Sequence, residues 1–494
     1  MKKQSVFLAL IILLNLVSVG FTSLASAAQQ PNILLIMSDD HSTRGLSIYG
    51  SYRNTTPNMD RLAHQGMRLT QCFAVNSICG PSRAAIITGK YGHKNGFRRN
   101  LLRFDGSQTT FPKLLQKAGY QTALVGKWHL SRNDAENPPT GFDYWNILPG
   151  QGDYYDPDMF DMGERKSHKG YATTIITEMG LEFLKKRDPD KPFLLMVHHK
   201  APHSPWGYTA KHESMYDGKT MPEPPTLWDD YATRSEATRT AQRSPMASLT
   251  ASMQNDEWAT GRLEDGGTTD PVKLKSLTYQ KFLKDYMRTV ASVDDSVGAL
   301  TDYIDSQGLK ENTIVIYTSD QGFFLGEHGW HNKRFFYEDA IRMPFIVRYP
   351  PEIKAGTMSN AMALNIDIAE TLLDFAGLSI PNEMQGRSLR PIFQGEQPDD
   401  WRTSMFYRYY QGTGVPIHYG VRTERYKLIR FHETDEWELY DLHKDALEVN
   451  NVYSQASYSS VVRQLKSEMK RLVKELEVGD SDLEEFVPNL PGTD

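Results

Sequence analysis

The sequence predicts an α/β fold with a central, mostly parallel sheet and a smaller C-terminal antiparallel sheet. Three observations support this: short apolar runs, helical segments between them, and a change of pattern near Asp399. The runs are near-continuous rather than alternating, which is typical of strands buried on both faces of a parallel sheet. They cover residues 32–38, 121–126, 192–199, 312–319 and 344–349.

Helical segments with recognisable ends lie between these runs. Predicted helices begin at Pro57 and Pro112, because a first helical turn tolerates proline. The longest predicted helix covers residues 278–306, with apolar side chains along one stripe. Asp367 and Glu370 form a predicted capping box. Strands that alternate with helices indicate a sheet whose faces are covered by helices.

The N-terminus has the three parts of a signal peptide. Two lysines precede an apolar run over about residues 6–16, and the small residues ASA at 25–27 form a cleavage pattern. The run is shorter than the ~20 apolar residues that a membrane-spanning helix needs. We therefore expect residues 1–27 to be removed and the protein to be exported, to the periplasm or as a secreted protein, without a membrane anchor.

The charge of the expected mature chain restricts its partners. Cleavage removes Lys2 and Lys3 and no acid, which leaves 53 basic and 61 acidic residues and a net charge of −8. This argues against a nucleic-acid or anionic-membrane binder, because both need a basic face. An anionic substrate would have to be held by a local cluster of cations.

The pattern changes from residue 399 on. The runs there are short, alternating and rich in aromatic residues, and they are followed by a predicted helix over residues 459–476. This indicates a small antiparallel sheet packed by a helix. We predict a catalytic domain of residues 28–398 and a C-terminal subdomain of residues 399–494. Within the first, residues 213–269 are polar and poor in aliphatic side chains, and we interpret them as surface loops.

Polar and charged side chains follow the ends of the predicted strands. Carboxyl ends of parallel strands share one edge of an open sheet, so we expect these side chains to converge on one crevice. They are, in chain order, Asp39, Asp40, Lys127, His129, His203, Asp320 and Gln321.

Four of these residues predict a metal site. Asp39, Asp40, Asp320 and Gln321 offer oxygen atoms only, and hard oxygen ligands select Ca²⁺ or Mg²⁺. Taken singly, acidic pairs at strand ends are solvated loop residues or helix caps, but two pairs that each follow a buried strand favour a shared site.

Cationic side chains predict an anion site in the same crevice. Arg83, Lys127 and Lys333 would hold a tetrahedral oxyanion if they meet, whereas singly they would be surface charges. His328 and His331 lie close by in the sequence, and we leave them outside the predicted set because they are as well explained as loop residues.

The chain has two cysteines, and one of them lies in an unusual turn. Cys79 is part of SICGPSR, where Pro81 opens a predicted helix and Ser82 and Arg83 occupy its first turn. A helix N-terminus favours anions. A disulfide to Cys72 is an alternative for an exported protein, but a chain of this size builds its core without one, and we interpret Cys72 as a small buried thiol.

Residues 79–89, CGPSRAAIITG, resemble the sulfatase signature, C-x-P-S-R followed by T-G. The resemblance extends through NILLIMSDDH, GKWH, KAPHSPW, TSDQGFFLGEHGWHNK and ELYDLHKD, and so covers nearly all of the expected mature chain. The sequence is similar to the type I, formylglycine-dependent sulfatases, among them bacterial enzymes that act on ulvan or glycosaminoglycans. This resemblance implies the alkaline-phosphatase-like sandwich of that family.

The resemblance also implies a covalent change at Cys79. In the family a dedicated maturing enzyme recognises C-x-P-S-R and oxidises this cysteine to formylglycine. One hydroxyl of the hydrated aldehyde attacks sulfur while the substrate alcohol leaves, and loss of a proton from the other hydroxyl then expels sulfate. A serine-type nucleophile would leave a stable sulfate ester.

The metal ligands that the resemblance implies agree with the oxygen cluster. Asp39, Asp40, Asp320 and Gln321 resemble the calcium ligands, with the modified Cys79 as a further ligand. Gln321 departs from the asparagine that is commonest there, although its side-chain oxygen can still bind a cation.

The remaining predicted residues resemble the catalytic groups. Arg83 resembles the residue that orients and activates the hydrate, and Lys127 and Lys333 resemble the cations that hold sulfate oxygens. His203 resembles the acid that protonates the leaving oxygen, and His129 the base that assists sulfate elimination.

We expect a sulfated polysaccharide, or its oligosaccharides, as substrate. Residues 140–160 are rich in aromatic, glycine and acidic side chains, and they form either a carbohydrate-binding loop or a rigid structural loop pinned by Pro149 and Pro157. A phosphomonoester or phosphodiester hydrolase of the same superfamily is one alternative, although we see a single set of oxygen ligands. A catalytically silent carbohydrate-binding protein with Cys79 as a thiol is another.

Overall fold

The computed structural model describes residues 30–100, 102–131, 137–241, 245–412 and 414–484. The predicted signal peptide, residues 1–27, lies outside these ranges. The described residues from Pro31 on form one compact unit, and the boundary proposed at residue 399 stays a prediction. In the part of the chain that the structure describes, no helix is long and apolar enough to cross a membrane.

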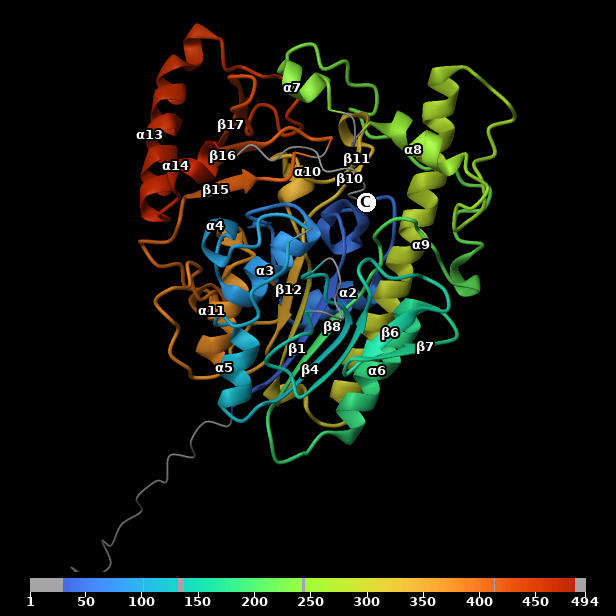
Figure 1. Ribbon diagram of the computed structural model, residues 1–494, viewed down its shortest axis with the longest axis vertical. Helices are drawn as coiled ribbons and strands as arrows, with labels where there is room; N and C mark the ends of the chain where they lie inside the picture. Colours follow the sequence, from blue (N-terminus) through green and yellow to red (C-terminus); the bar gives the residue numbers. More distant parts are fainter. Residues whose placement is uncertain (1–29, 101, 132–136, 242–244, 413, 485–494) are drawn as a thin grey trace, which may run out of the picture. The chain divides into compact units, whose positions relative to one another are not determined.

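Ten strands of the described residues form the central sheet, in the order β13-β2-β12-β9-β1-β8-β4-β5-β6-β7 (Figure 1). The five strands from β9 to β5 in this order pair in parallel, which confirms the predicted α/β class. The strands are β1 Asn32–Ser38, β2 Met67–Leu69, β4 Gln121–Lys127, β5 Tyr144–Leu148, β6 Asp158–Asp161, β7 Glu164–Ser167, β8 Phe193–His198, β9 Thr313–Ser319, β12 Phe345–Arg348 and β13 Thr357–Ser359.

One predicted parallel strand runs the other way. β12, which lies within the apolar run at residues 344–349, pairs antiparallel with both β9 and β2. All four of its residues are buried, as the apolar run indicates. An apolar run reports burial on both faces and carries no information on strand direction, so the expectation of a parallel strand was wrong here.

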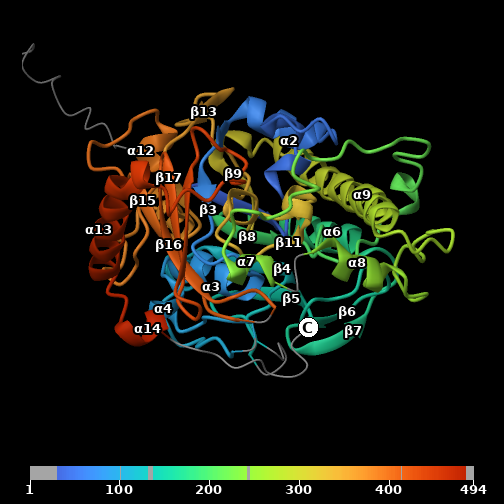
Figure 2. The same cartoon turned by 90° about the horizontal axis from the view of Figure 1, so that it is seen from above.

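Helices cover both faces of the sheet (Figure 2). Side chains alternate along β1: Ile33 and Leu35 belong to one core cluster, and Leu34 and Ile36 to the other. The first face is covered by α3 Cys79–Thr88, α5 Phe111–Lys117, α11 Asp367–Phe375 and α12 Arg390–Phe393, and the second by α2 Pro57–Gln65, α6 Ala172–Lys186 and α9 Pro271–Ser306.

The helix predicted over residues 278–306 is longer than expected. α9 begins at Pro271, where the side chain of Asp270 accepts a hydrogen bond from the Val272 backbone at 2.9 Å. Its first half supports the polar insert at residues 213–269, which contains α7 Glu236–Arg239 and α8 Met246–Met253. Methionine and aromatic side chains build a core between α8 and α9, so the interpretation of the insert as surface loops alone was wrong.

The predicted capping box on α11 is also not formed. Asp367 is the first helical residue, and its carboxylate accepts from the backbone N–H of Leu364 at 2.7 Å and of Arg387 at 2.8 Å. Glu370 instead accepts from the Gly386 N–H at 2.7 Å. Both acids hold distant loops, which a local sequence pattern cannot reveal.

The C-terminal sheet is antiparallel, as predicted, and has the order β15-β16-β17-β18. Apolar side chains of α13 Ser459–Glu475 pack with those of the sheet in one core cluster. The strands are β15 Ser404–Tyr409, β16 His418–Thr423, β17 Tyr426–Phe431 and β18 Glu436–Asp441. The remaining described elements are β3 Cys72–Phe73 paired with β14 Ala363–Leu364, β10 Phe324–Leu325 paired with β11 His331–Asn332, α4 Gly92–Asn95, α10 Glu338–Ile341 and α14 Asp480–Glu484, with short 3₁₀ turns between elements.

Candidate active site

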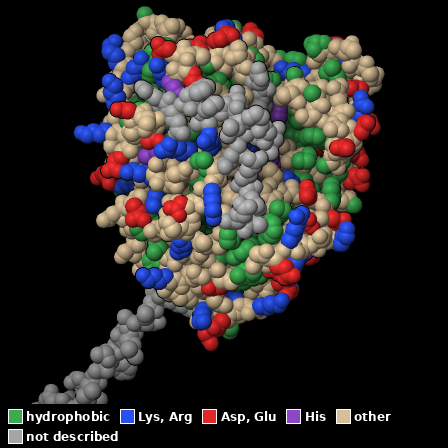
Figure 3. Space-filling model, in the orientation of Figure 1, with side chains coloured by type: hydrophobic (Ala, Val, Ile, Leu, Met, Phe, Trp, Pro, Cys, Tyr) green, Lys and Arg blue, Asp and Glu red, His purple; other side chains and the backbone are tan. Residues whose placement is uncertain are grey.

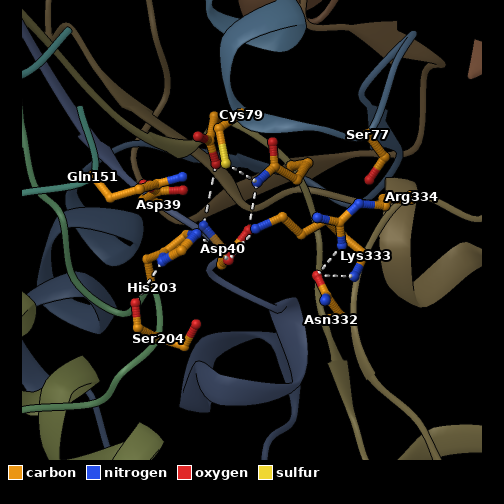
Figure 4. A network of polar contacts seen from close by, with 12 residues as sticks. Asp39, Asp40, Ser77, Cys79, Gln151, His203, Ser204, Asn332, Lys333 and Arg334 are labelled. Atoms are coloured by element: carbon orange, nitrogen blue, oxygen red, sulfur yellow. Dashed lines mark hydrogen bonds and ion pairs between the residues drawn. The ribbon is translucent and has the colours of Figure 1, made fainter. Parts of the chain in front are cut away.

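The structure brings the predicted site residues together beyond the carboxyl ends of the parallel strands (Figure 4). Asp39 and Asp40 follow β1, and Asp320 and Gln321 follow β9. Lys127 is the last residue of β4, and His129 and His203 lie in the loops after β4 and β8. Lys333 follows β11. Cys79 and Arg83 lie on α3, which begins at Cys79 rather than at Pro81. The site residues are buried except for His203, whose side chain is 13 % exposed.

The signature segment fits closely against the strand ends. Ser82 donates a hydrogen bond to the backbone carbonyl of Asp320, which ties α3 to the end of β9. A Cβ atom at Gly80 would lie 3.0 Å from the carbonyl oxygen of His129 and 2.7 Å from the ring of Phe97. A side chain beside Cys79 would therefore require the Phe97 ring to shift and would contact the backbone after β4 closely.

Three carboxylates meet at the centre of the site. Asp39, Asp40 and Asp320 each place an oxygen within 4.8 Å of the other two. Asp40 has a φ of 68°, a left-handed conformation that aspartate adopts more readily than most residues. Burial together with the nearby Asp39 raises the pKa of Asp320 to about 8, and burial raises the pKa of Asp40.

These oxygens fit a bound divalent cation. Asp39 Oδ1 and Gln321 Oε1 are buried and have no hydrogen-bond partner among the described residues. The Gln321 amide nitrogen lies 2.5 Å from Asp40 Oδ1, so the amide belongs to the same cluster. Carboxylate and amide oxygens are hard ligands, and a divalent cation would relieve the repulsion among three buried acids.

Each cation of the site pairs with one of these acids. Lys127 contacts Asp39, Lys333 Nζ lies 2.5 Å from Asp40 Oδ2, and Arg83 Nε donates to Asp320 Oδ2 at 3.1 Å. Burial alone would raise the pKa of Asp39, but Lys127 and the other nearby cationic groups bring it well below its usual range. Burial alone would likewise lower the pKa of Lys333, but Asp40 raises it above its usual value.

Cys79 lies beside the oxygen cluster. Its Sγ is 3.9 Å from the Gln321 amide nitrogen, and Cys79, Asp39 and His203 place potential ligand atoms within 4.8 Å of one another. Burial, with Asp39 nearby, raises the pKa of this thiol to about 12, so it stays protonated at neutral pH. Both cysteines are free, which excludes the disulfide alternative, and Cys72 is a buried thiol of the core.

The two predicted acid–base histidines have different surroundings. His203 Nδ1 lies 2.7 Å from the carbonyl oxygen of Ser204, which assigns the proton of a neutral ring to Nδ1 and leaves Nε2 3.7 Å from Asp40 Oδ2. His129 has a φ of 56°, and its buried Nδ1 has no partner among the described residues. Burial is the main cause that lowers the pKa of both rings.

His328 and His331, which we left outside the predicted set, are held by the insert at residues 213–269. His328 Nδ1 lies 2.9 Å from Asp229 Oδ2, and His331 Nε2 lies 3.2 Å from the hydroxyl of Ser248. Their contacts are therefore those of supporting residues.

Two residues of the site were missed in the sequence. Gln151 Oε1 lies 2.5 Å from Lys127 Nζ, and Lys200 is 2 % exposed with Nζ 4.9 Å from the ring centre of Tyr154. Gln151 and Tyr154 belong to the segment at residues 140–160, interpreted as a loop. β5 and the start of β6 occupy part of it, and both residues lie in the connection between these strands. A single glutamine in a loop has no sequence signal.

Comparisons with known proteins identify the family. The sulfatase family model matches residues 31–378, and the model for the C-terminal part of N-sulphoglucosamine sulphohydrolase matches residues 326–475. An N-acetylglucosamine-6-O-sulfatase from Bacteroides thetaiotaomicron is 42% identical over 522 residues, which cover 96% of this chain and 93% of that protein. An ulvan-active sulfatase from Formosa agariphila is 26% identical over 463 residues, 90% of this chain and 82% of that one.

A solved structure of a protein in complex with its substrate D-glucosamine-2-N,6-O-disulfate has a TM-score of 0.87 and 42% identity, and the match covers 92% of this chain and all of that one. The matched family model covers more than half of the described chain, and every predicted site residue falls within residues 31–378. The chain therefore belongs to the sulfatase family and is a hydrolase of sulfuric ester bonds.

Proposed function

We propose that the protein removes the 6-O-sulfate of N-acetylglucosamine or of a related glucosamine in a sulfated glycan. The observation that carries this proposal is the 42% identity to the N-acetylglucosamine-6-O-sulfatase over 96% of the chain. The ulvan-active relative has lower identity, so we favour a glycosaminoglycan over ulvan. We further propose that the protein is exported and meets this polymer outside the cytoplasm, because of the signal-peptide pattern at residues 1–27.

The nucleophile of the proposed reaction derives from Cys79. An unmodified thiol with a pKa of about 12 would be a poor nucleophile at neutral pH. Oxidation to formylglycine by a maturing enzyme would provide a hydrated aldehyde whose hydroxyl attacks sulfur. Arg83 is the residue that would orient it, since its guanidinium is held by Asp320 and by the carbonyl oxygen of Lys127 at 2.8 Å.

The cations of the site would bind the sulfate group. Lys127 and Lys333 are fixed by Asp39 and Asp40, so their ammonium groups need little reorganisation when an anion enters. Asp39, Asp40, Asp320 and Gln321 would hold one Ca²⁺, which would add positive charge where the sulfate oxygens lie. A network of this kind is specific for the charge and shape of a tetrahedral anion.

The two histidines would transfer protons in the two steps of the proposed reaction. Because Nδ1 of His203 donates to the Ser204 carbonyl, Nε2 carries a proton only in the imidazolium form, and it is from this form that Nε2 would protonate the leaving sugar oxygen. His129 has an unpartnered Nδ1 that can accept a proton during sulfate elimination.

The proposal is tested by peptide mass and sulfate release on one preparation. The protein is produced in a host that makes formylglycine, the peptide containing Cys79 is weighed, and sulfate release is measured from N-acetylglucosamine 6-sulfate, its 3-sulfate isomer and ulvan oligosaccharides. We expect the mass of formylglycine and release from the 6-sulfate. A thiol mass with no sulfate released from any substrate would refute the mechanism, and release from ulvan alone would refute the substrate.

A further inference from the structure

Two turns outside the central strands carry key groups of the site. Residues 76–78 precede Cys79, and residues 332–334 contain Lys333 (Figure 4). The second turn is strained, because Asn332 and Arg334 have φ angles of 89° and 92° and neither is glycine. Left-handed conformations at such residues persist only where the surrounding contacts hold them.

Each turn also has hydrogen bonds of its own. The Asn332 side-chain oxygen accepts from the Lys333 backbone N–H at 3.1 Å and from Arg334 Nη1 at 2.6 Å. In the other turn the Ser77 hydroxyl donates to the carbonyl oxygen of Ala340 at 2.5 Å. None of these bonds joins one turn to the other.

A tyrosine of the C-terminal sheet joins the two turns. The hydroxyl of Tyr407, on β15, donates to the carbonyl oxygen of Arg334 at 2.5 Å and accepts from the backbone N–H of Ser77 at 3.2 Å. Its ring is fully buried and stacks on Phe336, with 4.5 Å between ring centres and 5° between planes. Burial raises the pKa of Tyr407, so the hydroxyl keeps the proton that it donates.

We propose that Tyr407 is a positioning residue of the sulfatase reaction, whose hydroxyl fixes the turn before Cys79 to the turn that carries Lys333. Through this link the C-terminal sheet, which lies outside the central sheet, sets the separation between the nucleophile and a sulfate-binding cation. The inference rests on the proposed roles of Cys79 and Lys333.

The chemistry favours a positioning role over a purely structural one. Removal of the hydroxyl leaves a buried N–H and a buried carbonyl without their partner, one in each turn, while the stacked ring stays in place. The strained turn then loses a contact that holds it, and small displacements of reacting groups cost about 100-fold in rate. Catalysis should therefore fall more than stability does.

The test compares Tyr407→Phe with Tyr440→Phe in the full-length protein. Tyr440 is a matched control, because it is a fully buried tyrosine of the same sheet. Its hydroxyl lies 2.9 Å from the Tyr337 hydroxyl and donates to the Glu438 carboxylate at 2.9 Å. Sulfate release from N-acetylglucosamine 6-sulfate is normalised to the fraction of modified Cys79 measured by peptide mass. Inhibition by inorganic sulfate reports the anion site independently of turnover.

We expect Tyr407→Phe to lower kcat by 10-fold to about 100-fold and to weaken sulfate inhibition, while Tyr440→Phe stays within two-fold of the wild type. Hydrogen exchange should increase at residues 76–78 and 332–334 in Tyr407→Phe alone. A wild type without sulfatase activity would count against the proposed function. An active wild type with kcat unchanged in Tyr407→Phe, or lowered equally in both variants, would overturn the positioning role.

Discussion

The active site and the C-terminal sheet both bury charged side chains, but they differ in how these are paired. Next to the C-terminal sheet, Glu338 accepts from Arg422 at 2.8 Å and lies 2.9 Å from Lys427, which donates to Glu448 at 2.6 Å. In the active site, atoms of Asp39, Gln321 and His129 are buried without a partner among the described residues.

This difference separates structural from functional burial of charge. A buried polar group without a partner costs free energy, and in the active site a ligand or a reacting group would complete it. In the saturated network at Glu338, which joins α10 to β16 and β17, both carboxylate oxygens of Glu338 are paired. On the face drawn in Figure 3, acidic and basic side chains are interspersed.

The largest effect is expected at Cys79. Cys79→Ala removes the precursor of the proposed nucleophile, and we expect sulfate release to fall by at least about 10⁴-fold with the fold retained. Activity and thermal unfolding are measured on the same sample. Cys72→Ala is the matched control, because Cys72 is the other buried cysteine and lies in the core, and it should keep activity within a few-fold. Activity retained in Cys79→Ala would show that the nucleophile is assigned wrongly.

The second prediction concerns the saturated network. Glu338→Gln leaves Arg422 and Lys427 with a neutral partner in a buried place, and we expect it to lower the free energy of unfolding by about 3–5 kcal/mol. Denaturant unfolding measures this loss. Turnover per folded molecule should stay within about three-fold of the wild type. A large loss of turnover without a loss of stability would show that Glu338 serves catalysis rather than the fold.

The third prediction concerns Ca²⁺ at the unsaturated cluster. Calcium at about 100 times its dissociation constant should stabilise the chelator-treated protein by about 2.7 kcal/mol, because the cation binds the folded state. Thermal unfolding with and without Ca²⁺ measures the shift. Asp320→Asn removes one carboxylate of the cluster and should reduce the shift, while Glu338→Gln should keep it. An equal shift in Asp320→Asn would place the cation elsewhere.

The smallest effect is expected at an exposed ion pair. Arg471 and Glu475 lie on α13, and their side chains are 53 % and 59 % exposed. Solvent screens such pairs, so Glu475→Ala should change the free energy of unfolding by about 0.5 kcal/mol or less, measured by denaturant unfolding. A loss as large as that of Glu338→Gln would mean that burial does not decide the strength of these pairs.

Much of the fold could be predicted because buried strands have a recognisable local sequence pattern. The runs that became β1, β4, β8 and β9 are continuous and apolar, since both faces of these strands are covered. The direction of β12 and the packing of α8 left no such trace, because both depend on contacts with distant segments. The capping box at Asp367 shows the same limit, since its acids bind loops far along the chain.

The site was predictable to a similar extent, for a related reason. Asp39, Asp40, Asp320 and Gln321 directly follow strands that share one edge of the sheet, so their convergence follows from topology. Lys333, Gln151 and Tyr407 reach the site from segments outside the parallel strands. Lys333 was found through its motif, whereas the other two are single residues whose contacts form only in the folded chain.

The order of residues along this chain was sufficient to predict an α/β fold and an oxygen-rich cluster at the strand ends, because both depend on neighbours in sequence or on strand topology. The reactivity proposed for Cys79 rests on the resemblance of its motif to the sulfatase signature. The tertiary structure decided which buried atoms stay unpartnered and which residues link the turns of the site. Pairing of buried polar groups depends on distances of a few ångströms between segments far apart in the chain, as between Tyr407 and Ser77. Local sequence patterns carry no record of such distances.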